Sequence, residues 1–355
     1  MRLNRLTLEN IRNLAPSELN LGPALNRFSG PNGAGKSSLL EAIHLLASGR
    51  SFRTAQSERL IRHEATCLTV SAQTQVGDET HQLGMQRCRQ GTRLRMDGEN
   101  VDRLADIARA LPIIALHPDS HLLIDGSPDE RRRYMDWALF HADPGFHTHW
   151  QAYQKALRQR NAALKHARQD PTPWERQLAL HGEHITALRR NFVEEIRQLL
   201  DDQTQRLRIA HTLHIELSPG WNRELTLEEA LQRSRERDRL QGFTAAGPHR
   251  ADLRLRAGNQ LAAHIISRGQ QKDLVAVLKL CQARFLTHRG RHSPVVLIDD
   301  LPSELDETRR RALLDDLHGQ GLQMLVTCID ARDLPERDIP LRDFHVEGGS
   351  VRQLV

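Results

Sequence analysis

Apolar and polar residues alternate at the start of the chain and then give way to a glycine-rich loop. Residues 3–8 (LNRLTL) alternate with a period of two, which predicts a half-buried strand. Residues 27–47 predict the end of a strand, a glycine loop and then a helix. Short β-like runs separated by turn residues fill 67–97, and the apolar run 111–116 (LPIIAL) predicts a buried strand.

A helical pattern occupies the middle of the chain, from about 128 to 208. Apolar side chains and one histidine recur there at intervals of three and four residues: Trp174, Leu178, His181, Ile185, Leu188, Phe192, Ile196 and Leu199. The two prolines of residues 169–174 (QDPTPW) predict a sharp turn between two long helices. We therefore expect an antiparallel helical arm.

Strand and helix patterns alternate again after the arm. A capping box formed by Thr226 and Glu229 predicts the start of a helix. The predicted strands are 212–218, 264–267 (HIIS), 294–299 and 323–328, and further predicted helices are 270–286 and 307–318. This order predicts an α/β fold in which residues 1–125 and 209–355 form one head domain and residues 126–208 form an inserted helical lobe.

Composition adds a weak preference for an anionic partner. The 355 residues carry 50 Lys and Arg against 45 Asp and Glu, a formal net charge of +5, which favours polyanions. Most of the cations are Arg, and an arginine-rich genome explains that bias equally well. The four cysteines include no C-x-x-C, so neither a disulfide framework nor a zinc finger is predicted.

The chain shows no sign of a membrane or secretory segment. Residues 1–10 lack the apolar run of a signal peptide, and no stretch approaches the roughly 20 apolar residues of a membrane span. We expect a soluble, cytoplasmic protein without a membrane partner. Histidine pairs such as His117 and His121 are explained by chance among 19 histidines, and we predict no metal site there.

Residues 30–37 (GPNGAGKS) match the phosphate-loop pattern G-x-x-x-x-G-K-[ST] in full. The glycines let the backbone turn its N–H groups toward phosphates, the Lys36 ammonium reaches the β- and γ-phosphates, and the Ser37 hydroxyl ligates Mg²⁺. The predicted nucleotide site comprises Gly30, Pro31, Asn32, Gly33, Ala34, Gly35, Lys36, Ser37 and Ser38. An ordinary glycine-rich turn is the alternative.

Residues 295–300 (VVLIDD) place two acids directly after four apolar residues. A buried strand that delivers carboxylates to its C-terminal end stands where an α/β sheet binds ligands. We expect Asp299 to hold Mg²⁺ through water. Asp300 is expected to polarise the attacking water. Asp300 and Lys36 are the two predicted catalytic residues. The alternative is a core strand followed by a polar turn.

Residues 267–280 (SRGQQKDLVAVLKL) are a polar turn that runs into an apolar helix, and a helix start favours an anion. The order phosphate loop, SRGQQ, LIDD and SELD (303–306) resembles the ATP-binding-cassette ATPases, especially the branch with the SMC and Rad50 heads. In that family the Ser-Gly-Gln turn, here Ser267, Gly269 and Gln270, closes over the γ-phosphate held by a second copy. The resemblance therefore implies a homodimer that forms on ATP.

Six segments together resemble the RecF recombination-mediator family: residues 30–53, 126–136, 159–165, 247–253, 267–272 and 297–306. The match runs from residue 3 to about 328. It implies an ABC-type P-loop ATPase head, ATP and Mg²⁺ as cofactors, and weak DNA-stimulated hydrolysis. It further implies binding of single-stranded, gapped or junction DNA in repair and replication restart, with RecO and RecR helping to load RecA. Arg12 matches a family position near the nucleotide, although a surface arginine is an equally good interpretation.

The chain departs from the family pattern at several positions. Ala251 stands where an acid is expected, so the role of that acid is lost or passes to Asp252. Arg268 and the pair 272–273 (Lys-Asp) differ from the usual residues at the turn, and an extra charge there would alter how readily a dimer closes. No histidine follows the last strand, and we expect Thr327 to substitute for it.

Residues 151–168 contain five Lys or Arg and no acid. At about 100° per residue, three apolar side chains share one helix face and three cations fall on a neighbouring third. The apolar set is Tyr153, Leu157 and Leu164, and the basic set is Lys155, Arg158 and Lys165. We predict that the basic set contacts DNA phosphates. A solvated face of the arm is the alternative, and residues 130–136 (ERRRYMD) add three Arg, some paired with Glu130 and Asp136.

Two other functions fit part of the pattern. An ABC-transporter ATPase subunit would share the phosphate loop, but the long helical insert and the missing histidine argue against it. A structural SMC-like head would need hundreds of coiled-coil residues, whereas this arm is at most ~60 Å long on each side at 1.5 Å per residue. Stimulation of hydrolysis by DNA would separate the repair mediator from the transporter.

Overall fold

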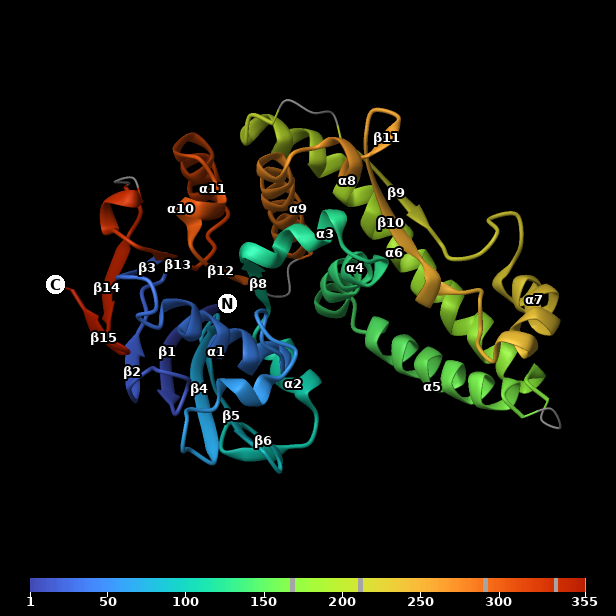
Figure 1. Cartoon of the computed structure of the whole chain (residues 1–355), viewed down its shortest axis with the longest axis horizontal. Coiled ribbons are helices and arrows are strands. Elements are labelled where there is room, and N and C mark those ends of the chain that lie inside the picture. The colour runs from blue at the N-terminus through green and yellow to red at the C-terminus, as the bar shows by residue number, and fades with distance from the viewer. Residues whose placement is uncertain (167–169, 210–212, 290–292, 335–337, 355) are drawn as a thin grey trace. The chain divides into compact units, whose positions relative to one another are not determined.

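The computed structural model describes residues 1–354 except 167–169, 210–212, 290–292 and 335–337. The described chain divides into two compact units. Figure 1 shows the chain coloured from its N-terminus to its C-terminus. The head unit contains Met1–His121, Gln205–Ile209 and Arg268–Val355, and the arm unit contains Leu122–Thr204 and Ala210–Ser267. None of the described helices is long and apolar enough to cross a membrane.

The first sheet of the head unit is antiparallel and has the strand order β2-β1-β4-β5-β6-β7. Its strands are β1 (Arg2–Glu9), β2 (Ser17–Asn20), β4 (Cys67–Val76), β5 (Glu79–Cys88), β6 (Gly91–Met96) and β7 (Glu99–Val101). The strands predicted at 3–8 and within 67–97 are confirmed. On β4 the side chains of Leu68, Val70 and Ala72 alternate into the core, as the period of two requires.

The second sheet of the head unit carries the elements that lead into the predicted nucleotide site. Its order is β15-β14-β3-β13-β12-β8, and all its pairs are parallel except β14 with β15. The strands are β3 (Leu25–Ser29), β8 (Ile113–Leu116), β12 (Val295–Ile298), β13 (Met324–Cys328), β14 (Leu341–Glu347) and β15 (Ser350–Gln353). All four residues of β12 are buried, which explains its uninterrupted apolar run.

Helix α1 (Lys36–Ser48) lies between the two sheets of the head unit (Figure 1). Its apolar side chains belong to one core cluster with residues of β1, β4 and the parallel sheet. The other head helices are α2 (Leu104–Ala110), α9 (Arg268–His288), α10 (Leu301–Glu304) and α11 (Glu307–Gly319), with 3-10 turns at Ser57–Leu60, Pro118–His121 and Ala331–Asp333. Because α1 is buried against both sheets, its N-terminal end is fixed next to the ends of the parallel strands.

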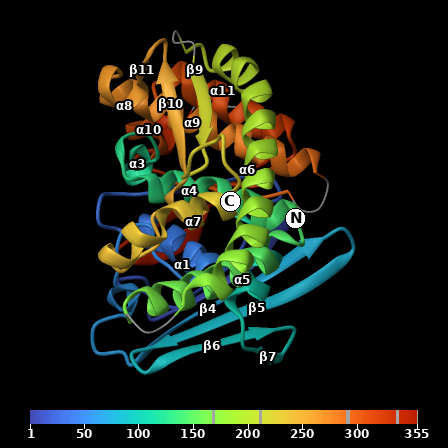
Figure 2. The same ribbon diagram turned by 90° about the vertical axis from the view of Figure 1, so that its right-hand side faces the viewer.

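The arm unit combines long helices with a small antiparallel sheet of order β11-β10-β9. Its elements are α3 (Leu122–Asp125), α4 (Pro128–Ala142), α5 (Phe146–Leu164), α6 (Thr172–Arg206), β9 (Leu213–Ser218), α7 (Leu227–Gln241), β10 (Asp252–Ala257), β11 (Gln260–Leu261) and α8 (Ala262–Ile265). Figure 2 shows α6 beside β9 and β10. The two predicted long helices are present, and the capping box of Thr226 and Glu229 starts α7.

The division into units differs from the predicted boundaries, because β9, α7 and β10 belong to the arm unit. The guanidinium of Arg197 on α6 donates to the carbonyl of Ile215 on β9 at 3.2 Å, and the N–H of Leu227 donates to Glu183 on α6 at 3.0 Å. A strand pattern alone does not say which sheet a strand joins. The strand predicted at 264–267 is wrong, since α8 covers Ala262–Ile265.

Cys67 and Cys88 form a disulfide, although no disulfide was expected from the cysteine spacing. The two residues face each other across the paired strands β4 and β5, with Cα atoms 4.1 Å apart. The two cysteines meet because of the pairing register of the β4–β5 hairpin. The spacing of the cysteines along the chain does not reveal that register. Cys281 and Cys328 are buried and lie outside this disulfide.

Candidate nucleotide site

The loop from Gly30 to Gly35 joins β3 to α1, and two of its glycines are required by the structure. Gly30 has φ 152°, and a Cβ there would lie 2.0 Å from the carbonyl oxygen of Val346. Gly35 has φ 115°, and a Cβ there would lie 2.6 Å from the Leu14 side chain. A residue with a side chain fits neither position without displacing its neighbours.

Lys36, the first residue of α1, folds its ammonium back over this loop. The Nζ atom donates to the carbonyl oxygens of Gly30 at 2.6 Å and Pro31 at 2.9 Å. Burial lowers the pKa of Lys36, and the nearby Asp300 and Asp299 oppose that shift. Phosphate oxygens are stronger acceptors for an ammonium than carbonyl oxygens are, so the geometry suits a bound polyphosphate.

Ser37 and Asp299 come together from opposite ends of the sequence. The Ser37 hydroxyl donates to the Asp299 carboxylate at 2.8 Å, and the Thr327 hydroxyl donates to the same oxygen at 2.9 Å. Burial raises the pKa of Asp299, and these two hydrogen bonds counteract the shift. A hydroxyl beside a carboxylate is a hard oxygen donor set of the kind that Mg²⁺ takes together with water and phosphate.

Thr327 also fixes the backbone of Asp300, because its hydroxyl accepts the Asp300 N–H at 2.7 Å. Asp300 precedes α10 in the left-handed region, with φ 53° and ψ 52°, where a residue with a side chain is uncommon. Its carboxylate accepts the Ser303 hydroxyl at 2.6 Å. The chain therefore holds Asp300 in a strained conformation directly after the Mg²⁺-type donor set.

Arg12 lies beside the phosphate loop and pairs with a buried acid. Its guanidinium donates to Glu41 of α1 at 2.9 Å, and Arg53 approaches the same carboxylate at 3.4 Å. The Arg12 Nε atom is buried and makes no hydrogen bond. The neighbouring Asn13 donates to the carbonyl of Gly33 at 2.9 Å. Sequence reasoning missed Glu41 and Asn13, because neither belongs to the phosphate-loop pattern.

The start of α9 is exposed, as the predicted Ser-Gly-Gln turn requires. Ser267, Arg268 and Gly269 are all exposed, and a Cβ on Gly269 would meet no atom within 4 Å. Gln270 follows on the same turn of α9 and is half-buried. The role of these residues toward a second copy stays a prediction.

The two unusual charges after that turn have ion-pair partners in the head unit. Lys272 donates to the Ser303 carbonyl at 2.7 Å and pairs with Glu304 at 3.1 Å. Asp273 pairs with Arg309 at 3.4 Å. The charges of Lys272 and Asp273, which depart from the family pattern, are therefore compensated by Glu304 and Arg309, which follow Asp300 in the sequence.

The basic set Lys155, Arg158 and Lys165 is exposed on α5 and at its C-terminal end, while the apolar set Tyr153, Leu157 and Leu164 is buried. The predicted separation of the two faces is confirmed, whereas DNA contact by the basic set stays a prediction. Arg168 lies outside the described residues.

The arginines of residues 130–136 are tied to acids. Arg133 pairs with Glu130 at 2.6 Å as expected, but Asp136 pairs with Arg189 instead, at 2.8 Å. Asp252, the acid beside Ala251, pairs with Arg131 at 2.7 Å. Within the described ranges, no cluster of three or more His, Cys, Asp or Glu could hold a metal ion.

Comparison with known proteins decides the family. The family model described as RecF/RecN/SMC N terminal domain matches residues 2–351. The DNA replication and repair protein RecF of Azotobacter vinelandii is 43% identical over 99% of both chains. The chain belongs to the RecF family. The RecF protein of Pseudomonas aeruginosa is 41% identical, over 99% of this chain and 98% of that relative.

Solved structures agree with RecF membership. The structure described as the recombination mediator protein RecF-ATP in the RecFOR pathway has a TM-score of 0.88 and 26% identity, over 99% of this chain and 97% of that one. An Smc head bound to the C-winged helix domain of ScpA has a TM-score of 0.62 at 14% identity and shares the fold. The predicted fold class, an α/β ATPase head of the ABC and SMC type, is confirmed.

Proposed function

We propose that this RecF-family protein is an ATP-gated DNA-binding mediator of recombinational repair. The observation that carries the proposal is the hydrogen bond between Ser37 and Asp299, which joins the phosphate loop to the end of β12. A solved relative is described with ATP in the RecFOR pathway, and the curated relatives are DNA replication and repair proteins. An ordinary glycine-rich turn would give no reason for the phosphate loop to lie beside the acid that follows β12.

Each residue of the site has a separate task in the proposal. Gly30–Ser38 wraps the phosphates of ATP, and the Lys36 ammonium exchanges its carbonyl partners for phosphate oxygens. Ser37 and Asp299 would hold Mg²⁺, which supplies positive charge to the phosphates when bound. Asp300 orients the attacking water, and the strained backbone that Thr327 fixes keeps its carboxylate in place.

A second copy of the chain completes the site in this proposal. Ser267, Gly269 and Gln270 would close over the γ-phosphate held by the partner, and the exposure of Ser267 and Gly269 leaves them accessible for that contact. Because the completed site needs ATP, the dimer forms on ATP and dissociates after hydrolysis. Hydrolysis is weak in the free protein and is stimulated by DNA.

DNA binds through the basic set of α5 in this proposal, and the dimer acts with RecR and RecO to help load RecA at single-stranded gaps. The exposure of Lys155, Arg158 and Lys165 supports the assignment, since phosphate contacts need accessible cations.

Sedimentation of the protein with and without ATP, Mg²⁺ and gapped DNA tests the proposal as a whole. We expect a monomer without ATP, a dimer with ATP and Mg²⁺, and co-sedimentation of the dimer with the DNA. A Lys36→Ala protein is the control, and it should stay monomeric under all conditions. A wild-type protein that remains monomeric with ATP, or that binds DNA equally without it, would contradict the ATP gate.

A further inference from the structure

Two large apolar side chains project into solvent where α7 ends. Leu240 is 90% exposed and Phe243 is 40% exposed. Scattered exposed leucines are common on proteins, so exposure alone assigns no role. We call these two residues the apolar pair, and their surroundings set them apart.

The turn that carries the apolar pair is held rigidly. Gly242 ends α7 in the left-handed region with φ 73°, and its N–H donates to the carbonyl of Asp238 at 2.8 Å. The backbone N–H of Thr244 donates to the Asn161 side chain at 2.8 Å. The N–H of Ala245 donates to the Asp238 carboxylate at 3.2 Å. Backbone on both sides of Phe243 is thereby fixed to the arm.

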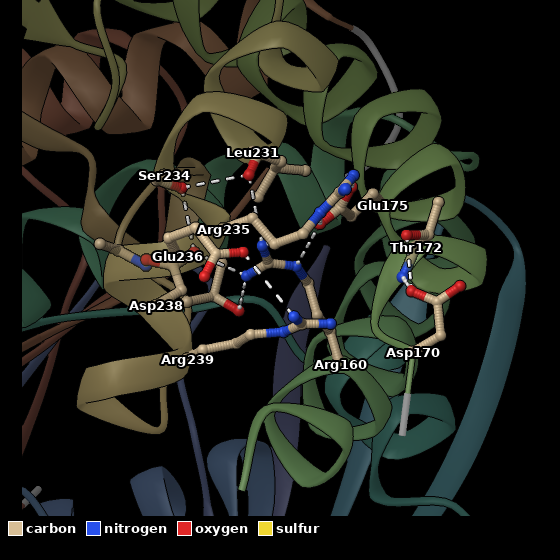
Figure 3. Close-up of polar contacts among 12 residues, drawn as sticks. Arg160, Asp170, Thr172, Glu175, Leu231, Ser234, Arg235, Glu236, Asp238 and Arg239 are labelled. Carbon is tan, nitrogen blue, oxygen red and sulfur yellow. Dashed lines mark hydrogen bonds and ion pairs between the residues drawn. The ribbon is translucent and has the colours of Figure 1, made fainter. Parts of the chain in front are cut away.

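A buried ion cluster joins α5, α6 and α7 (Figure 3), and it reaches the same turn through Thr244 and Ala245. Arg160 of α5 is fully buried, and it pairs with Asp238 at 2.7 Å and with Glu175 at 3.0 Å. Arg235 pairs with Glu175 at 2.6 Å, and the Arg160 guanidinium also donates to the Thr244 hydroxyl at 2.9 Å. Buried ion pairs of this kind contribute little net stability, so accurate placement of the turn is the better reason for the cluster.

Two cations lie beside the turn that carries the apolar pair. The guanidinium carbon of Arg250 lies 5.0 Å from the centroid of the Phe243 ring. A Cβ built on Gly242 would lie 3.6 Å from the Lys165 side chain, so the turn touches the basic set of α5. Arg239 is exposed as well and pairs with Glu236 at 3.7 Å. The apolar pair is therefore continuous with the surface assigned to DNA phosphates.

We propose that Leu240 and Phe243 pack against an unstacked base at the boundary between single-stranded and duplex DNA, while Lys165 and Arg250 contact the flanking phosphates. Apolar wedges stabilise broken base stacking, and aromatic rings stack on free bases of any sequence. The neighbouring cations favour a polyanion over an apolar protein partner. This inference rests on the proposed DNA contact of α5 and adds the residues that would contact the boundary of a gap.

The test uses gapped DNA with a fluorescent purine analogue placed beside the gap, and the intact protein with ATP and Mg²⁺. Binding of the wild-type protein should unstack the analogue and raise its fluorescence. In the variant Leu240→Ala/Phe243→Ala the rise should disappear, and gapped DNA should bind about tenfold more weakly, because one base stack is worth about that factor. Affinity for uninterrupted duplex should not change. Leu180→Ala, at a 60% exposed leucine of α6, is the matched control and should behave as wild type.

The outcomes separate this inference from the proposed function. If the double variant binds gapped DNA and raises the fluorescence as wild type does, the apolar pair does not contact DNA, whatever the rest of α5 does. If it loses affinity for gapped DNA and for uninterrupted duplex equally, selective recognition of the boundary is wrong. If replacing the basic set leaves all DNA binding intact, the proposed α5 surface fails as well. Circular dichroism of each variant checks folding.

Discussion

At the residue scale, Lys36 and Asp300 are expected to serve separate steps. Lys36→Ala removes the cation that neutralises the phosphates, so ATP binding should fall below detection in equilibrium dialysis. Asp300→Asn keeps the shape of the side chain but weakens its ability to polarise water. That variant should bind ATP, fail to hydrolyse it, and remain dimeric. An Asp300→Asn protein that is monomeric with ATP would refute the role assigned to this residue.

We expect His117 of the head unit to make the stability of the protein depend on pH. Its ring stacks on Phe52 at a centroid distance of 4.8 Å, its Nδ1 atom is buried without a hydrogen bond, and burial lowers its pKa to about 3. The unfolded chain takes up this proton near pH 6.5, so protonation favours unfolding as the pH falls below that value. Near pH 5 the loss is about 2 kcal/mol relative to neutral pH.

His117→Phe keeps the ring contact and removes the proton site, so urea unfolding of the variant should lose that part of the pH dependence. His63→Phe replaces a histidine whose side chain is 97% exposed and should leave the dependence unchanged. An unaltered pH dependence in His117→Phe would show that His117 is not the buried neutral group described.

Local motifs were enough to predict several side chains that the structure brings together at the phosphate loop. Lys36 and Ser37 follow from the loop pattern, and Asp299 follows from an acid placed after an apolar run. Glu41 was missed because a charged residue in the middle of an amphipathic helix reads as solvent-exposed, whereas here Arg12 and Arg53 satisfy it inside the core. Such pairing depends on tertiary neighbours that the sequence does not place side by side.

At the element scale, the buried ion cluster fastens α5, α6 and α7 to one another. Arg160→Met removes one cation and leaves Asp238 and Glu175 buried without it, which typically costs about 3–5 kcal/mol. Arg158→Met changes an exposed residue on the same helix and should stay within about 0.5 kcal/mol of wild type. Chemical denaturation followed by circular dichroism measures both. Equal stability of the two variants would refute the structural role of Arg160.

The start of α9 carries the proposed contact between two copies. Ser267→Arg should leave ATP binding by the monomer nearly intact, because the phosphate loop lies elsewhere in the sequence. Dimerisation and hydrolysis should stop, because the bulky cation fills the space for the partner's γ-phosphate. Mixing this variant with Lys36→Ala allows at most one intact site per heterodimer. Full activity of the Ser267→Arg protein on its own would show that the turn does not contact the partner's nucleotide.

Elements were predicted better than their partners. Periodicity identified α6, β12 and β13, because long amphipathic or fully apolar runs leave few alternatives. It failed for α8, where the apolar residues of a four-residue helix also fit a short strand. It also could not assign β9 to the arm unit, since the choice depends on hydrogen bonds to β10, about forty residues later.

At the scale of the whole molecule, DNA binding should be mainly electrostatic. Replacing Lys155, Arg158 and Lys165 with Gln removes three exposed cations and leaves the buried apolar set unchanged. The slope of log affinity against log salt should flatten by about two to three units, since each phosphate contact contributes about 0.9. Titrations at several salt concentrations measure the slope, and ATP binding serves as the control. An unchanged slope would move the DNA site to another surface, such as the head around Arg53, Arg59 and Arg62.

The position of β3 in its sheet also has a consequence for synthesis of the protein on the ribosome. Among the described strands, β3, which leads into the phosphate loop, pairs with β13 and β14. These strands are translated roughly 300 residues later, a delay of about 15–60 s at bacterial rates. Most of the arm unit lies between these segments and is complete long before the head can close. We therefore expect the apolar surface of α1 that faces the parallel sheet to stay uncovered until β13 and β14 emerge, so chaperones that bind exposed apolar segments should raise the yield of folded protein.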